Sequence, residues 1–114
     1  MAKYETHLSG DFFGLLQLID DGILRGSASA SFEDGSDWQA RGVRCAVRVY
    51  ERYSLIGSNR VSLSVTLVGA ADSLFISAIT SGGSQAILFK LNTVGEESFL
   101  SCLTDIVERY RASQ

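Results

Sequence analysis

The spacing of apolar residues changes along this chain, and this change limits the possible folds more than any other feature. Near each end of the chain, apolar residues recur every three or four positions, which is the period of an amphipathic helix. Elsewhere they alternate with polar residues, which is the period of a half-buried strand. The chain is therefore expected to fold as an α+β protein with an N-terminal and a C-terminal helix.

Length and composition predict one domain over residues 1–114, because a chain of 114 residues with 46% hydrophobic residues can bury about two thirds of its unfolded surface. Cys45 and Cys102 follow no metal-ligand spacing and fall on apolar faces, so we expect reduced core thiols, with a disulfide as the less favoured alternative. No segment has the roughly 18 apolar residues of a membrane span, and the start has no apolar leader. These features predict a cytoplasmic protein without membrane contact.

The two helices are expected from their apolar stripes and capping residues. The first helix begins at a cap on Ser9 or Asp11 and ends near Gly26. The last helix is expected to begin at the stretch "TVGE", in which Thr93 and Glu96 have the spacing of a capping box.

Six strands are expected around these helices. They cover 3–8, 27–33, 43–53, 60–68, 73–80 and 86–92. Because the chain has no proline, turns must use clusters of Gly, Asn, Asp and Ser, and four such clusters occur: 33–37, 57–59, 69–73 and 81–84. The order strand, helix, five strands, helix predicts a single antiparallel sheet of about six strands with both helices on one face.

Arginine is concentrated in the centre of the chain. Between residues 41 and 60 there are five arginines and one acidic residue, Glu51, although the net charge of the whole chain is −3. In the strand 43–53, alternation places the residues Val43, Cys45, Val47 and Val49 on one face and the residues Arg44, Arg48 and Arg52 on the other. We expect this arginine face to be the solvated side of the sheet, interleaved with hydroxyl groups of the next strand.

A binding role for these arginines is the alternative. Neighbouring arginines of the stripe are about 13 Å apart on a strand, too far to clamp one phosphate together, although Arg60 could complete a site for an anion or an acidic protein partner. The acidic composition argues against a nucleic-acid binder, which usually has a basic face.

The loop "TSGGSQ" invites comparison with phosphate-binding loops. It leads into a predicted strand instead of a helix and lacks the Lys-Ser/Thr pair of a P-loop, so we favour a hairpin turn. A backbone anion nest is the alternative, formed by Ser81, Gly82, Gly83 and Ser84.

Catalytic signals are weak. His7 is the only histidine and lies on the polar side of the first strand, and no closely spaced set of His, Cys, Asp or Glu suggests a metal site. Trp38 lies in a turn-rich stretch, where we favour packing onto the sheet over closing on a ligand or anchoring a partner. We therefore expect a protein that is not an enzyme and has no catalytic residues, metal or cofactor.

Two resemblances to known folds and families are present. The order of the elements resembles a reduced helix-grip (START-like) fold, without the usual second short helix after the first. The stretches "LSGDF" (8–12), "VRCAVRVYERY" (43–53) and "FISAITSGGSQA" (75–86) resemble a family of small, roughly 110-residue bacterial proteins of unknown function. That family implies no catalytic residues, so function must be argued from the residues themselves.

Two hypotheses for the function follow. The favoured one is a structural or protein-interaction module that forms a homo-oligomer through strands 74–79 and 86–91, whose two faces are both apolar. The alternative is a domain that holds a small apolar or anionic ligand between the sheet and the last helix, near Tyr50, Tyr53, Phe75 and Phe99.

Overall fold

A computed structural model describes residues 1–53, 59–82 and 89–114, and for residues 89–93 it describes the backbone alone. The elements follow the chain in this order: β1 (Ala2–Ser9), α1 (Phe12–Gly26), β2 (Ser31–Ala40), β3 (Val43–Tyr53), β4 (Arg60–Ala70), β5 (Ser73–Gly82) and α2 (Phe89–Ala112).

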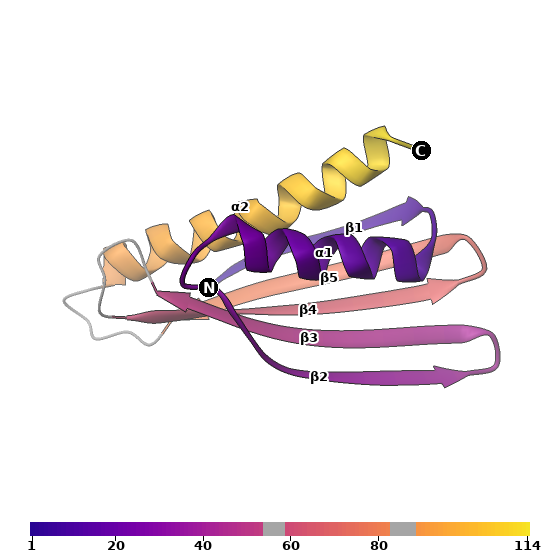
Figure 1. The fold of residues 1–114 in the computed structure, drawn as a ribbon, viewed down its shortest axis with the longest axis horizontal. Helices are drawn as coiled ribbons and strands as arrows, with labels where there is room; N and C mark the ends of the chain where they lie inside the picture. Colours follow the sequence, from indigo (N-terminus) through magenta and orange to yellow (C-terminus); the bar gives the residue numbers. More distant parts are fainter. Residues whose placement is uncertain (54–58, 83–88) are drawn as a thin grey trace.

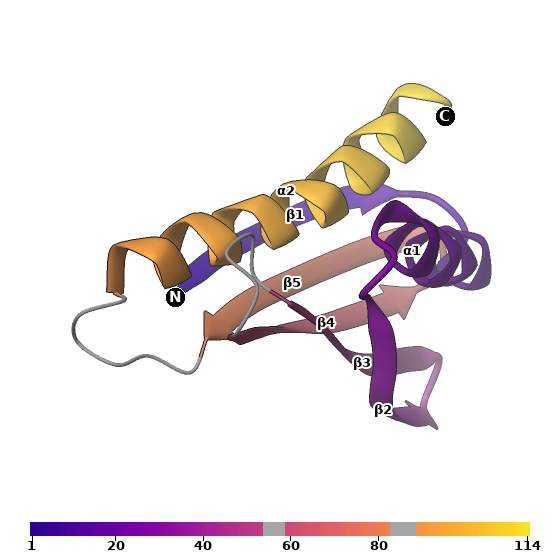
Figure 2. The same cartoon turned by 60° about the vertical axis from the view of Figure 1, so that its left-hand side comes forward.

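The five strands form one antiparallel sheet in the order β1-β5-β4-β3-β2. Both helices lie on the same face of this sheet, with α2 along β1 and β5 and α1 beside it (Figures 1 and 2). The predicted α+β architecture, with one antiparallel sheet and both helices on one face, is therefore confirmed with five described strands instead of six. The hairpin of β2 and β3 bends away from the helices (Figure 2).

Helix α1 forms as its sequence predicts. The Asp11 side chain caps the helix by accepting a hydrogen bond of 2.7 Å from the Gly14 amide, so Asp11 and not Ser9 is the cap. One stripe of the helix faces the sheet and is buried: Phe12, Leu15, Ile19 and Ile23.

Strand β2 differs from the prediction. The strand expected at 27–33 begins at Ser31, and the cluster 33–37, expected as a turn, lies inside β2 with Trp38. The chain turns at Arg41 and Gly42, whose φ angles of 53° and 80° suit a two-residue hairpin. The Asp-Gly-Ser residues are tolerated because β2 is an edge strand with a register shift after Phe32, where ladder geometry is less demanding.

The sixth predicted strand, 86–92, is also wrong. Phe89 begins α2, so Thr93 and Glu96 lie inside a helix instead of capping its start, and residues 86–88 are outside the described part. A short apolar run fits a buried strand and a buried helix equally well, and its period could not distinguish them.

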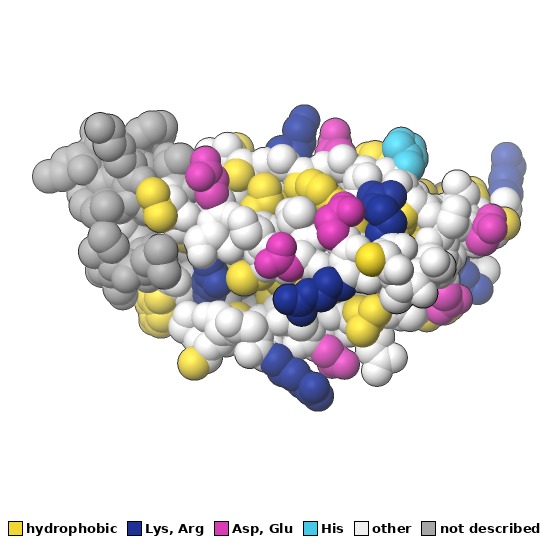
Figure 3. Space-filling view, turned by 90° about the horizontal axis from the view of Figure 1, so that it is seen from above, with side chains coloured by type: hydrophobic (Ala, Val, Ile, Leu, Met, Phe, Trp, Pro, Cys, Tyr) yellow, Lys and Arg dark blue, Asp and Glu magenta, His cyan; other side chains and the backbone are white. Residues whose placement is uncertain are grey.

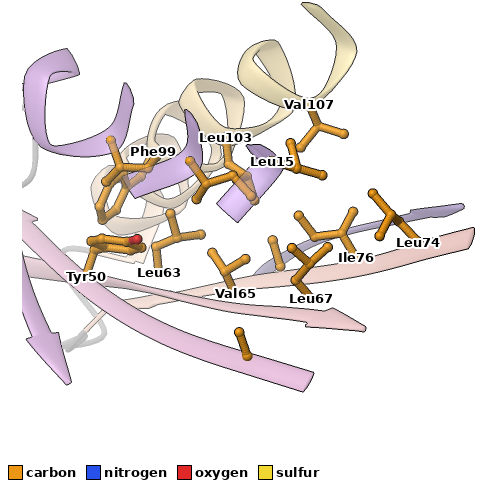
Figure 4. Close-up of a cluster of buried hydrophobic side chains, with 14 of the residues drawn as sticks. Leu15, Tyr50, Leu63, Val65, Leu67, Leu74, Ile76, Phe99, Leu103 and Val107 are labelled. Atoms are coloured by element: carbon orange, nitrogen blue, oxygen red, sulfur yellow. The ribbon is translucent and has the colours of Figure 1, made fainter. Parts of the chain in front are cut away.

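The core fills the space between the sheet and the two helices (Figure 4). Tyr50 of β3 lies under Phe99 of α2, and both rings are fully buried. Leucine, isoleucine and valine side chains from β4, β5 and both helices complete the core, including Leu15, Leu63, Leu67, Ile76, Leu103 and Val107. Burial of each such side chain contributes about 1.5 to 3 kcal/mol.

The two cysteines are free thiols, Cys45 in β3 and Cys102 in α2. Cys102 is partly buried and packs against the core, as expected. Cys45 is half-buried but pairs with Val68 on the face without helices, so its expected place in the core is wrong.

Candidate functional site: the helix-free face of the sheet

The arginines of β3 lie on the side of the sheet that the helices cover. Arg48 pairs with Val65 and Arg52 with Val61, and both valines are buried in the core. Directly opposed residues of an antiparallel pair share a face. The expectation of a solvated arginine face is therefore wrong, and the hydroxyl groups of β4 lie on the opposite face from these arginines.

The physical reason is the position of the helices. They cover β1, β5 and β4, and reach β3 mainly near Tyr50 and Arg52, so the rest of this face of β3 accommodates long, partly exposed side chains. Arginine can bury its methylene stem there and still satisfy its guanidinium group. Alternation identified two faces of β3 correctly, but it could not show which one the helices would cover.

Arg52 is the most buried of the four candidate arginines, with 8% of its surface exposed. Its guanidinium lies 4.6 Å from the centre of the Phe99 ring and donates a hydrogen bond of 2.8 Å to the Ser98 hydroxyl. A weaker contact of 3.6 Å joins it to the Cys102 sulfur. This arrangement makes Arg52 part of the packing between β3 and α2.

Arg48 and Arg44 are held by the edge strand. Arg48 forms an ion pair of 2.9 Å with Asp37 and donates to the Val47 carbonyl at 2.9 Å. Arg44 donates to the Gln39 side chain at 2.6 Å and lies 4.8 Å over the ring of Phe13.

Arg60 lies on the other face and is the first residue of β4. It pairs with Glu51 at 2.6 Å and Glu33 at 3.6 Å, and its guanidinium lies 5.1 Å from the centre of the Tyr53 ring. The hydrogen bond from Arg60 lowers the pKa of Glu51 below its ordinary value. The four candidate arginines therefore occupy separate places, each with a partner within the chain, and do not form one anion site.

The glycine loop is only partly described. Ser81 and Gly82 end β5, where they pair with Ser62 and Val61, whereas Gly83 and Ser84 lie outside the described residues.

The four aromatic residues of the expected ligand pocket are divided between the two faces. Tyr50 and Phe99 fill the core, whereas Tyr53 and Phe75 lie on the helix-free face. The Tyr50 hydroxyl donates to Asp20 at 3.0 Å, and burial, with this carboxylate next, raises the pKa of Tyr50 far above its ordinary value. The structure does not bring these residues together around one ligand.

The face without helices carries an apolar row that crosses all five strands. The pairings of the sheet align one residue from each strand: His7, Phe75, Val68, Cys45 and Trp38. We call this the aromatic row. The His7 and Phe75 rings lie 5.0 Å apart, and Trp38 is 61% exposed. Solvent contact of this extent is unusual for a tryptophan.

Neighbouring rows add apolar and polar groups. The next row toward the N-terminal end of β1 contains Glu5, Ser77, Thr66, Val47 and Ser36, and the one after it contains Lys3, Ile79, Ser64, Val49 and Asp34. We call the last of these the charged row, because a lysine and an aspartate stand at its ends. Within it, Ile79 is 41% exposed. The sequence contained the signal for this face in the alternation of β3, where Val43, Cys45, Val47 and Val49 share one side.

A second surface feature is a cleft between α1 and the β2–β3 hairpin. It has a volume of about 560 Å³ and is lined by Phe13, Leu16, Gln17, Asp20 and Leu24 of α1 and by Phe32 and Arg48 of the hairpin. Phe13 and Phe32 are about half exposed. The cleft exists because the hairpin bends away from α1, which the local pattern of the sequence does not show.

Other types of site receive little support from the described residues. No group of three or more His, Cys, Asp or Glu side chains in the described part lies close enough to hold a metal ion. Neither of the described helices combines the length and apolar character needed to cross a bilayer. On the face seen in Figure 3, acidic and basic side chains of the described residues are interspersed with hydrophobic ones.

The fold defines a two-layer α+β protein in which both described helices cover the same face of the sheet. The chain belongs to a family of unknown function, DUF6054, whose model matches residues 1–111. This confirms the resemblance to a family of small proteins of unknown function. No curated protein matches the chain.

Proposed function

We propose that this protein is a non-enzymatic interaction module that works as a homo-oligomer through the helix-free face of its sheet. The observation that carries the proposal is the aromatic row, which places Trp38, Phe75 and Val68 on one exposed face of the sheet. Burial of such a surface against another protein is favourable by about 25 cal/mol for each Å² of apolar area. Large exposed apolar patches on proteins commonly mark interaction sites.

The polar surroundings of this face agree with an interface. At the far end from the aromatic row, Arg60, Glu51 and Glu33 form a network of ion pairs on the same side of the sheet. Protein interfaces typically have an apolar centre and a polar rim that stays accessible to water. A bacterial origin, a cytoplasmic location and a helix-grip relationship accompany this proposal as expectations from the sequence.

Size-exclusion chromatography with light scattering over a concentration series tests the oligomer. The full chain is expected to form a dimer or larger assembly that persists on dilution, and Trp38→Glu is expected to shift it to monomers. Leu18→Glu is the matched control, because Leu18 is 47% exposed but lies on α1, away from this face. A monomeric wild-type protein at all concentrations contradicts the proposal.

The cleft between α1 and the hairpin favours a second candidate function, the binding of a small amphipathic molecule. Its volume lies within the usual range for ligand sites, about 300 to 1,000 Å³. Phe13 and Phe32 offer apolar contacts, while Asp20 and Arg48 offer charged groups. The cleft differs in position from the ligand site expected between the sheet and the last helix.

Native mass spectrometry of the protein purified from its own cells tests this second candidate. A retained molecule of defined mass that is lost in Phe32→Ser and kept in Trp38→Ser supports binding in the cleft. A ligand-free wild-type protein, or a ligand retained equally by both variants, contradicts it.

A further inference from the structure

We infer that the partner on the helix-free face is a second copy of this chain, related by a two-fold axis that runs parallel to β4. This inference rests on the proposed homo-oligomer and specifies its geometry. Its basis is the register of the sheet, which places oppositely charged residues, Lys3 and Asp34, at the two ends of the charged row.

β4 is the middle strand of the five, with two strands on each side. A two-fold axis along the middle strand and in the plane of the interface places β1 of one copy over β2 of the other. Each row then lies over the same row of the partner with its two ends exchanged. The contact is self-complementary, as a two-fold interface requires.

In the charged row, this exchange brings Lys3 over the partner's Asp34, and the same pair forms twice in the dimer. Lys3 can reach this partner, because its side chain is 60% exposed and its ion pair with Glu5 of its own chain is long, at 3.9 Å. In the same row, Ile79 lies over the partner's Val49.

In the aromatic row, the exchange brings Trp38 over the partner's His7 and Cys45 over the partner's Phe75. The exposed indole therefore meets an imidazole ring that already packs beside Phe75. Pairs of aromatic rings attract each other beyond the area that they bury. In the row between, Glu5 lies over the partner's Ser36, so no like charges meet in these three rows.

An axis perpendicular to the strands is less favourable. It places β2 over β2, and β2 carries two acidic residues on this face, Glu33 and Asp34, which would then gather across the interface. Pairing of two β2 edges is opposed by the same charges and by the register shift after Phe32. At the other edge of the sheet, formed by β1, the carbonyl of His7 accepts a hydrogen bond of 2.9 Å from Arg111 of α2. This carbonyl is therefore already paired within its own chain.

The size of the face suits a dimer. Its strands are 8 to 11 residues long. At about 3.3 Å per residue and about 4.8 Å between strands, the face covers roughly 800 Å². A specific interface of standard size buries about 800 Å² on each partner.

Charge reversal at the two ends of the charged row tests the axis. Lys3→Asp and Asp34→Lys are each expected to raise the dimer dissociation constant at least about fivefold, because each creates two like-charge contacts. Mixing the two variants is expected to give a heterodimer close to wild-type affinity, since both contacts then join opposite charges. Arg25→Asp and Asp21→Lys make the same changes in net charge on α1 and serve as controls.

The outcomes separate this inference from the proposed function. Preferential heterodimer formation, seen by light scattering and native mass spectrometry, supports the axis along β4. A dimer that Trp38→Glu disrupts but the two charge reversals leave unchanged overturns the axis and retains the face. A wild-type monomer, or a dimer unaffected by Trp38→Glu, overturns both. Circular dichroism of each variant confirms that the altered, exposed positions leave the fold intact.

Discussion

The ring of Tyr110 lies against the backbone of Gly10, and its hydroxyl oxygen accepts a hydrogen bond of 2.6 Å from the Asp11 amide. Tyr110 is near the end of α2, whereas Gly10 and Asp11 connect β1 to α1. This contact therefore joins the C-terminal end of the last helix to the beginning of the first, about 100 residues earlier in the chain.

Gly10→Ala is expected to destabilise the protein, because an added Cβ would lie 2.5 Å from the Tyr110 hydroxyl oxygen. The free energy of unfolding should fall by about 1 to 3 kcal/mol, as for other overpacked contacts. Urea denaturation measures this change. Gly26→Ala is the control, since a Cβ there meets nothing within 4 Å. Equal stability of Gly10→Ala and the wild type would contradict the close contact.

Arg52→Ala is expected to lower the free energy of unfolding by about 2 to 4 kcal/mol, because it removes buried packing and leaves a space beside Phe99. Arg52→Met should lose less than half as much stability as Arg52→Ala, since methionine keeps an aliphatic chain in the same place. Arg44→Ala should cost less than about 1 kcal/mol, as expected for a partly exposed cation–aromatic contact. If the methionine variant is as unstable as the alanine variant, charge and not packing determines the role of Arg52.

The raised pKa of Tyr50 predicts a loss of folding stability at alkaline pH. Burial raises its pKa in the folded state above the ordinary value of 10.0, so the folded protein holds this proton more tightly than the unfolded chain. The resulting stabilisation is present below pH 10 and is lost as the pH rises above it. Urea midpoints from about pH 9 to about pH 12 should fall less steeply in Tyr50→Phe than in the wild type.

The control for the alkaline experiment is Tyr53→Phe, because Tyr53 is 49% exposed. Its alkaline profile should follow that of the wild type. A Tyr50→Phe profile as steep as the wild-type profile would show that the Tyr50 proton does not limit alkaline stability.

The lowered pKa of Glu108 predicts a loss of folding stability in acid. The hydrogen bond from the Tyr4 hydroxyl, followed by the hydrogen bond from Arg111, lowers the pKa of Glu108 below its ordinary value of 4.5. A lowered pKa stabilises the folded state above pH 4.5, and this contribution is lost as the pH falls below that value. Glu108→Gln should therefore be less stable than the wild type at neutral pH but should lose less stability on acidification.

Thermal melts from about pH 7 to about pH 3 measure the acid dependence. Glu97→Gln is the control, because the Glu97 carboxylate forms no ion pair with the described cations, and its profile should match that of the wild type. Glu51 still contributes in both variants, since Arg60 lowers its pKa as well. Parallel acid profiles for Glu108→Gln and the wild type would contradict the prediction.

Local patterns predicted the elements whose signals are local. The cap at Asp11 and the stripe of α1 depend on residues within one or two helical turns. The same holds for β3 and β4, whose alternation extends over 11 residues each. Their antiparallel pairing was expected and is confirmed by the register from Val43 to Tyr53. The predictions were weaker for β2, where Asp-Gly-Ser composition suggested a turn, and for the run that enters α2.

The helix-free face was harder to predict because it depends on contacts between distant parts of the chain. The sequence by itself determined that β3 has a valine side and an arginine side, since side chains alternate along any strand. Only the tertiary structure decided which side meets the helices, because Phe99 of α2 packs over Tyr50 and Arg52. The same packing leaves Trp38 and its row exposed, since two helices on one face cannot cover the other.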